Sequence, residues 1–407
     1  MRDFLYGALG MAFRNGTNLI LIIVVTNYLG QGVAGEFLYA LSFSMVLALI
    51  VDYSFNISVP LLAQDAPERV YNSLALKVLL GFLSLVILLL IINFGLYPYN
   101  SDILIVIYLS VMINSFSNFF VLVFRGQGEF LNESLMIVKN NSILLFISLA
   151  VMCYEASLLL LSLAYLLSRI IGFCVIFNGT KKYYYNIQAR LKLMEVVYEL
   201  KSGFTFAFLV GLGYLYVSLD TIALGYVVAP SDVAFYQILL QMALALCLTS
   251  NNLSQLYIVK FNNSRKSGDL NINYVKKVLA YSFLIGFVVA LIYFFISPFV
   301  MGYIYKIKDS RVYDVVLFLS LIIILRHGIG ILGAFITVCG TNLYRILSTM
   351  TGVVFLTVAL LYYNLELSVE VCARLLFFSH VMIFFAMVLS TMYINMIKKV
   401  KVNEINL

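Results

Sequence analysis

The sequence predicts an all-α polytopic membrane protein of about 12 transmembrane helices, arranged as two parallel six-helix lobes around a central cavity. Three observations favour this fold class. The 407 residues are 63% hydrophobic and only 11% charged, a balance that no soluble domain shows. Runs of about 20 apolar residues, the length that crosses a hydrocarbon core as a helix, recur along the whole chain. The short alternating segments of a transmembrane β-barrel are missing from the sequence.

We expect twelve spans, and the basic residues indicate their orientation. Lys and Arg accumulate in loops on the cytoplasmic side of a membrane. If both termini are cytoplasmic, most of the 26 Lys and Arg residues fall on that side, with Lys77 among them at the inner end of the third span. The net charge of +7 then reflects topology, and no nucleic-acid partner is needed to explain it. The spans are expected at residues 5–28, 37–62, 74–96, 103–124, 134–154, 156–178, 202–228, 233–259, 278–302, 315–337, 346–364 and 373–396.

The stretches that follow the first and the seventh spans are similar to each other. "NYLGQGVAGEFLYALSF" and "IALGYVVAPSDVAFYQILLQ" each contain Leu-Gly, a short outer turn with small residues, and an aromatic residue that opens the next helix. Gly30 and Gly225 mark these turns, while Gly128 and Gly340 mark the inner turns after the fourth and tenth spans. Because six spans separate the copies, the two halves keep one orientation and are predicted to be parallel repeats.

The longest predicted inner connection, "KKYYYNIQARLKLMEVVYELK", lies between the two halves. Its residues Ile187, Leu191, Met194 and Val197 recur at helical spacing with charged residues between them. This pattern is typical of an amphipathic helix that lies on the membrane surface. We therefore predict four parts of the chain: an N-terminal six-helix lobe at 1–178, a cytoplasmic amphipathic linker at 179–201, a C-terminal six-helix lobe at 202–397 and a cytoplasmic tail at 398–407.

Six ionisable residues fall inside the predicted spans. At the centre of a bilayer each costs about 2.5–3.5 kcal/mol on insertion scales, so each must face water, a partner or a ligand. Basic residues outnumber acidic ones, as expected if the ligand itself brings negative charge, because a buried charge without a partner is costly. The candidate substrate-binding residues are Arg14, Arg169, Arg326 and Lys139, and the candidate ion-coupling or counter-ion residues are Asp52 and Asp220.

Some of these residues also have a purely structural interpretation. Lys139 lies a turn or so from the inner surface and could extend its ammonium group to the interface. Arg14 could do the same if the first span begins later than expected. Arg169 could pair with Asp52 or Glu155 between helices instead of lining a cavity.

Arg326, in "IILRHGIGILGAF", is harder to explain as a packing residue. It has eleven residues of its span on either side, and three glycines within the next seven residues let another helix or a ligand approach. The adjacent His327 could titrate, although a histidine in this setting is more often a packed polar group. Asp220, in "VSLDTIALG", could be the counter-ion of a basic residue across the cavity, or a proton or sodium site.

The sequence contains no motif for catalysis or for metal binding. Five cysteines lie singly in apolar surroundings without a Cys-x-x-Cys pair, so neither a metal site nor a disulfide framework is indicated. P-loop, His-Glu-x-x-His and nucleophile-elbow motifs are missing. We predict that the protein is not an enzyme and needs no cofactor beyond H⁺ or Na⁺ as a coupling ion.

Several short stretches together carry a family resemblance that covers the whole chain. They are "YLGQGVAGEF" after the first span, "LIVDYSF" with Asp52 in the second, "RGQGEF" closing the fourth and "LDTIALG" with Asp220 in the seventh. With the twelve-span layout, they resemble the Wzx-type polysaccharide flippases, a branch of the superfamily that also contains MurJ-type lipid flippases and multidrug and toxin extrusion transporters. MurJ-like proteins usually add two C-terminal spans, whereas this chain ends with "MIKKVKVNEINL".

The resemblance implies a flippase of the bacterial inner membrane with both termini in the cytoplasm. Its substrate would be an undecaprenyl-pyrophosphate-linked oligosaccharide, moved from the inner to the outer leaflet by alternating access for O-antigen (lipopolysaccharide) or capsule assembly. Membrane lipid and the polymerase and chain-length proteins of the same polysaccharide pathway would be its other partners. Arg326, with Arg14 and Arg169, would hold the diphosphate, and Asp52 and Asp220 would balance the empty site.

Two other classes of membrane protein fit the sequence less well. A multidrug-type antiporter would prefer an acidic cavity for cationic substrates, whereas the predicted cavity is net basic. A membrane-embedded O-antigen polymerase or glycosyltransferase would present catalytic groups on a sizeable outer loop, and every expected outer loop has roughly a dozen residues or fewer. The flippase therefore remains the favoured prediction.

Overall fold

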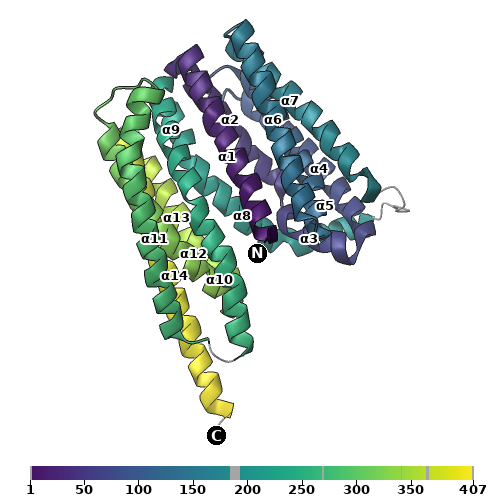
Figure 1. Ribbon diagram of the computed structural model, residues 1–407, viewed down its shortest axis with the longest axis vertical. Helices are drawn as coiled ribbons and strands as arrows, with labels where there is room; N and C mark the ends of the chain where they lie inside the picture. The colour runs from purple at the N-terminus through teal and green to yellow at the C-terminus, as the bar shows by residue number, and fades with distance from the viewer. Residues whose placement is uncertain (1, 184–192, 268–269, 341, 364–365, 406–407) are drawn as a thin grey trace. The chain divides into compact units, whose positions relative to one another are not determined.

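The structure is a computed structural model that describes residues 2–183, 193–267, 270–340, 342–363 and 366–405, and this part of the chain is helical apart from turns and loops (Figure 1). Twelve of its segments are long and apolar enough to cross a membrane, which confirms the predicted all-α fold and the number of spans. The helices are α1 (Arg2–Leu29), α2 (Gln31–Asp52), α3 (Phe55–Asp65), α4 (Pro67–Asn93), α5 (Ser101–Gly126), α6 (Phe130–Tyr154), α7 (Leu158–Thr180), α8 (Leu193–Val227), α9 (Pro230–Leu246), α10 (Leu248–Lys266), α11 (Ile272–Phe299), α12 (Val312–Cys339), α13 (Asn342–Tyr362) and α14 (Val369–Ile405), with short turns η1 (Lys181–Tyr183) and η2 (Val300–Ile304).

The chain forms two compact units, Met1–Phe235 and Tyr236–Leu407. Helix α8 belongs to the first unit, where it packs against α2 and α4. The domain bounds expected from the sequence divide the chain earlier, at the linker 179–201, and they stay a prediction. Of that linker, residues 184–192 lie outside the described part, while the part from Leu193 onward continues into α8 without interruption.

Two of the twelve spans are broken near their middle. The second span consists of α2 and α3, and the break lies at Tyr53 and Ser54, where Tyr53 adopts a positive φ of 39°. The eighth span consists of α9 and α10, which are separated by Cys247. The two broken spans are six positions apart in the order of the spans, as the predicted repeat requires. Membrane transporters use such discontinuous helices to expose backbone groups inside the membrane.

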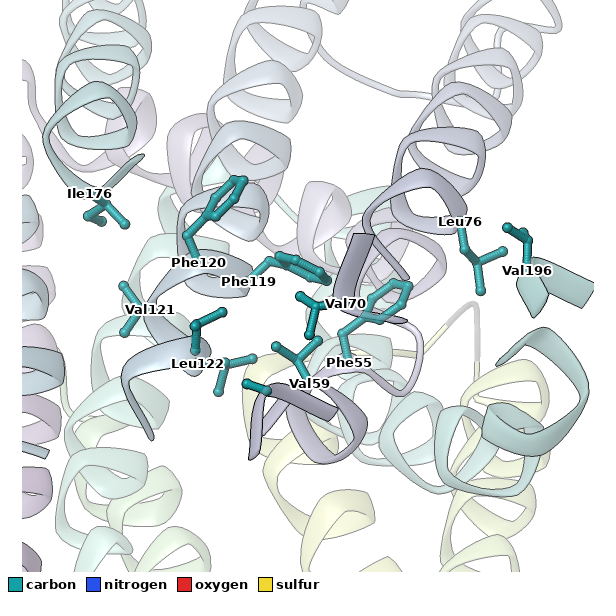
Figure 2. Close-up of a cluster of buried hydrophobic side chains, with 12 residues drawn as sticks. Phe55, Val59, Val70, Leu76, Phe119, Phe120, Val121, Leu122, Ile176 and Val196 are labelled. Atoms are coloured by element: carbon teal, nitrogen blue, oxygen red, sulfur yellow. The ribbon is translucent and has the colours of Figure 1, made fainter. Parts of the chain in front are cut away.

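A cluster of apolar side chains surrounds the first break (Figure 2). Phe55 and Val59 of α3 pack there with residues 119–123 of α5, and Val196 joins them from the first turn of α8. Val196 is buried, whereas Met194 beside it is 83% exposed. The start of α8 is therefore anchored to α3, α4 and α5 through one of its faces.

The two turns that the sequence matched to each other differ in their backbone. Gly30, before α2, has a φ of 86°, a conformation that favours glycine. Gly225 instead lies within α8, and its Cα faces the ring of Tyr39 so closely that a Cβ would overlap it. The turns also contact each other inside the first unit, because Gln31 Nε2 donates a hydrogen bond to the Ser231 carbonyl at 3.0 Å.

Replacing Gly35 by Ala should destabilise the packing of α2 on the start of α9. A Cβ at Gly35 would overlap the Pro230 carbonyl, a backbone atom that cannot move aside easily. Overpacking of this kind costs about 1–3 kcal/mol, so we expect a lower unfolding temperature for the purified protein. The control is Gly32→Ala in the same turn, where a Cβ would meet nothing within 4 Å. Equal stability of the two variants would contradict the close packing.

Candidate functional site

In the first unit, the polar site centres on a buried ion pair at the break between α2 and α3. Lys77 of α4 is only 1% exposed, and its Nζ lies 3.2 Å from Asp52 Oδ1. The same ammonium group donates to the Val51 carbonyl at 3.0 Å and to Ser115 Oγ at 2.6 Å. Ser115 of α5 also donates to Asp52. Three helices therefore meet at one lysine.

Counting Lys77 among the residues of the inner surface was wrong. The third span begins at Pro67 rather than at residue 74, which places Lys77 about three turns inside it. The rings of Phe55, Phe116 and Phe119 lie 5.2, 5.4 and 5.9 Å from its Nζ and shield the charge from water. Asp52 is consequently paired with Lys77, a partner that was not predicted from the sequence.

Arg14 of α1 belongs to the same unit and is exposed. The charged and phenolic groups that act on it are Tyr214 of α8, Arg169 of α7 and Arg125 of α5. Tyr214 in turn lies within the field of Asp52, so that a line of polar groups runs from α1 through α8 to α2. Arg125 is already held by a bidentate pair with Glu133, at 3.1 and 3.2 Å from its Nε.

Arg169 is buried, with 4% of its surface exposed, yet few protein groups satisfy its guanidinium. Its Nη2 donates to the Tyr165 hydroxyl at 3.2 Å, and the same ring lies 5.1 Å from Cζ. Among the described residues, none is a hydrogen-bond partner of its Nε. One turn further along α7, Gly172 makes room for Asn140, whose Oδ1 also lacks a donor. Buried polar atoms left without partners mark a place where water or a ligand is expected.

The structural alternative for Arg169, an ion pair with Asp52 or Glu155, is not seen in the described part of the chain. Among the residues that the structure describes, neither Asp52 nor Glu155 lies within ion-pair distance of Arg169. Lys139 of α6 is exposed and has no recorded ion pair within the same ranges. Its two interpretations, snorkelling to the interface or binding substrate, both stay open.

In the second unit, Arg326 of α12 lies at the break between α9 and α10. Its guanidinium interacts with the Cys247 side chain and acts electrostatically on His380 of α14. Helix α10 is fixed beside it, because Ser250 Oγ donates to the Arg326 carbonyl at 2.7 Å. For the described part of this unit, no carboxylate is recorded within 4 Å of Arg326. Arg326 is thus a partly exposed cation in the middle of the tenth span, and its predicted role in substrate binding stays a prediction.

His327 is a packed polar residue, in line with the structural interpretation of the sequence. It is 1% exposed, its Nδ1 lies 2.8 Å from the Ile323 carbonyl and its Nε2 lies 2.9 Å from Thr249 Oγ1. Both ring nitrogens are thus engaged within α12 and α10. The imidazole is positioned to join the helices rather than to meet a ligand.

Arg345 was not recognised from the sequence, where it was expected in an inner segment. It lies in the first turn of the eleventh span, and its Nη1 donates to Thr337 Oγ1 of α12 at 3.3 Å. A Cβ placed on Gly333 would lie 3.7 Å from its Nε, so the absence of a side chain at that glycine gives the guanidinium its space. Arg265 reaches the same end of α12 and donates to the Val338 carbonyl. Arg326, Arg345 and Arg265 therefore lie along α12 between its middle and its end at Cys339. The glycines of α12 were the sequence signal for this arrangement.

Asp220 is fully buried within α8. Its Oδ1 accepts from the Thr221 backbone N–H at 2.7 Å and lies 3.3 Å from Thr221 Oγ1. Its predicted role as a coupling or counter-ion residue stays a prediction. The structure brings Asp52, Arg14 and Arg169 into one polar region of the first unit, and it places Arg326 with Arg345 in the second.

Neither a family model nor a curated protein matches this sequence. Solved structures match it over nearly its full length. The lipid II flippase MurJ in an inward closed conformation superimposes with a TM-score of 0.76 and 13% identity, covering 96% of this chain and 90% of that chain. The MATE multidrug transporter DinF-BH gives a TM-score of 0.70 at 12% identity, over 97% of this chain and 95% of that chain.

A third match is an outward-facing multidrug resistance MATE family transporter of the MOP superfamily. It has a TM-score of 0.67 and 16% identity, covering 98% of this chain and 96% of that chain. These identities are too low to transfer a substrate, and what they share with this chain is the architecture. The chain has the fold of the MurJ lipid II flippase and of the MATE transporters, built from twelve spans.

Proposed function

We propose that this chain is a Wzx-type flippase, which moves an undecaprenyl-pyrophosphate-linked oligosaccharide from the inner to the outer leaflet of the bacterial plasma membrane. The observation that supports this proposal most is that three arginines inside the spans lack a carboxylate partner in the described residues. Arg14, Arg169 and Arg326 lie within spans, and none has a carboxylate partner in the ranges that the structure describes. A guanidinium held in this way favours an anionic ligand.

The diphosphate of the lipid-linked substrate suits these arginines chemically. It carries about two negative charges and pairs of oxygen acceptors on each phosphorus, which a guanidinium fork binds by paired, charge-assisted hydrogen bonds. The sugar headgroup cannot enter hydrocarbon without a large cost, whereas the prenyl tail can remain in lipid. Arginines that replace the water around the diphosphate would lower the barrier to crossing, and alternating access would then expose the headgroup on the outer side.

A multidrug exporter is the second candidate, because the MATE fold is shared. Such a protein needs a free carboxylate for a cationic substrate. In the first unit, Asp52 is neutralised by Lys77 at 3.2 Å, which makes it a poor site for a second cation. Asp220 remains as a buried carboxylate, and we propose that it holds the coupling H⁺ or Na⁺ rather than the cargo.

Two assays separate these functions. Deletion of the gene should cause lipid-linked oligosaccharide to accumulate in the inner leaflet, and expression of the wild-type chain should restore surface polysaccharide. Purified chain in liposomes should move a fluorescent lipid-linked diphosphate and should not move a cationic dye. Transport of the cationic dye without transport of the lipid-linked diphosphate would favour the exporter instead.

The proposed orientation has its own test. A reporter domain fused after Asp232, in the first turn of α9, should be active only in the periplasm. A matched fusion after Gly128, in the turn between α5 and α6, should be active in the cytoplasm. Activity on the same side for both fusions would mean that the spans between the two turns were assigned incorrectly.

A further inference from the structure

The end of α2 has the properties of a cation site. The break at Tyr53 ends the helix at Asp52 in the middle of a span, so the last carbonyl groups of α2 lack the backbone donors that a continuing helix would supply. The negative end of the helix dipole adds to the charge of Asp52. Interrupted helices of membrane transporters coordinate Na⁺ or H⁺ with such carbonyl groups.

At this break, the position of the cation is taken by a side chain of the protein itself. The Lys77 ammonium group has three hydrogen-bond donors, and it finds three oxygen acceptors of different kinds: the Val51 carbonyl, the Asp52 carboxylate and the Ser115 hydroxyl. Phenylalanine rings from α3 and α5 cover the ammonium group. The shell is composed of hard oxygen ligands, the type that an alkali-metal ion would use.

The second broken helix provides an internal comparison. There the Leu246 carbonyl accepts a hydrogen bond from Thr249 Oγ1 at 2.8 Å, within the same span. The nearby basic group is Arg326, which interacts with the Cys247 side chain and has no carboxylate beside it in the described chain. In the described chain, a carboxylate, a helix-end carbonyl and a lysine therefore come together at the first break and not at the second.

We propose that Lys77 is a tethered cation: its ammonium group occupies an alkali-metal-type site at the end of α2, so that the first unit carries its own counter-ion in place of bound Na⁺ or K⁺. The inference does not depend on the proposed transport function, because it concerns binding alone. It has one direct consequence. Removing the lysine side chain should convert the position into a site for a free monovalent metal ion.

Thermal unfolding of Lys77→Ala in detergent tests this conversion. Cys247 and Cys372 are buried, so a thiol-reactive dye reports unfolding as their thiol groups become accessible. The protein is heated in NaCl, KCl or choline chloride at constant ionic strength. We expect Na⁺ or K⁺ to raise the unfolding temperature of Lys77→Ala by about 2–4 °C relative to choline, and to leave the wild type unchanged.

Two matched variants identify the site. Lys77→Met fills the same volume with an apolar chain, and the double variant Lys77→Ala with Asp52→Asn removes the carboxylate, so neither should respond to Na⁺ or K⁺. A folded Lys77→Ala that responds equally to all three salts would overturn the proposal. If that variant does not fold, binding of radioactive Na⁺ to the wild type decides, with the double variant Asp52→Leu and Lys77→Met as the comparison because it removes the whole pair: Na⁺ binding that this double variant loses would overturn the proposal, and equal binding by the two proteins supports it.

Discussion

Arg326→Ala should reduce transport of the lipid-linked oligosaccharide by about 10- to 100-fold at low substrate concentration. A hydrogen bond to a charged group contributes about 1.5–3 kcal/mol, and each 1.4 kcal/mol is about tenfold in affinity. Arg326 is the mid-depth arginine of the second unit and has no carboxylate partner in the described ranges, so its loss removes a ligand contact rather than a structural pair. Flipping in liposomes and surface polysaccharide in cells both measure this effect.

Two further variants test whether the loss of transport is specific to the guanidinium group of Arg326. Arg326→Lys should retain part of the activity, because an ammonium group keeps the charge but loses the bidentate geometry. Arg311→Ala should transport normally, since Arg311 lies outside the spans and is held by Asp309 at 2.7 Å. Hydrogen bonds from Arg311 lower the pKa of Asp309 below its usual value, so both stay charged there. Wild-type transport by both Arg326 variants would show that Arg326 does not bind the headgroup.

Asp52→Asn should destabilise the first unit by about 3–5 kcal/mol, because it leaves the Lys77 ammonium buried without an opposite charge. Lys77 is 1% exposed and cannot reach water without opening the contacts between α2, α4 and α5. The unfolding temperature in detergent measures the loss. Replacing both residues by apolar ones, with Asp52→Leu and Lys77→Met, should cost much less, because removing a whole buried pair is often nearly neutral. Equal losses for the single and the double variant would mean that the pair itself is not the cause.

The number of spans could be predicted from the sequence because each span is a long apolar run that buries its surface in lipid. Such a run can be recognised without knowing which helices pack beside it. The ends were less accurate: the second span was expected at 37–62 and extends over Gln31–Gln64. Small and polar residues such as Gln31 and Ser231 lie at these ends, and their place in the helix depends on a tertiary contact. A hydropathy profile cannot show that contact.

The breaks within the second and eighth spans could not be predicted. Neither "IVDYSFN" nor "LALCLTS" contains Gly or Pro, the residues that usually interrupt a helix. The positive φ of Tyr53 is maintained by distant parts of the chain: its hydroxyl donates to the Leu200 carbonyl at 2.5 Å, and Gly203 packs against Ser54. A local pattern cannot show a strain that other helices impose.

The candidate site was predicted in part. Charges inside apolar runs indicated Arg14, Arg169 and Arg326 as candidates, since the cost of burying them does not depend on knowing the fold, and their role in binding stays a prediction. The same reasoning passed over Lys77 and Arg345, because both lie near a predicted span end, where a basic residue usually belongs to the cytoplasmic loop. Their contacts with Asp52 and Thr337 depend on where α4 and α13 begin and on helices that are distant in the sequence.

The two interrupted helices differ in mechanical stiffness. A break removes backbone hydrogen bonds, so each one is a joint at which half a span can pivot. Lys77 cross-links the first joint through charge-assisted hydrogen bonds to α2 and α5. At the second joint, the hydroxyl groups of Thr249 and Ser250 contact α12, at His327 Nε2 and at the Arg326 carbonyl. Because charge-assisted hydrogen bonds are the stronger kind, bending during a working cycle should be easier at Cys247, and faster amide hydrogen exchange there than at Tyr53 would reveal this unequal compliance.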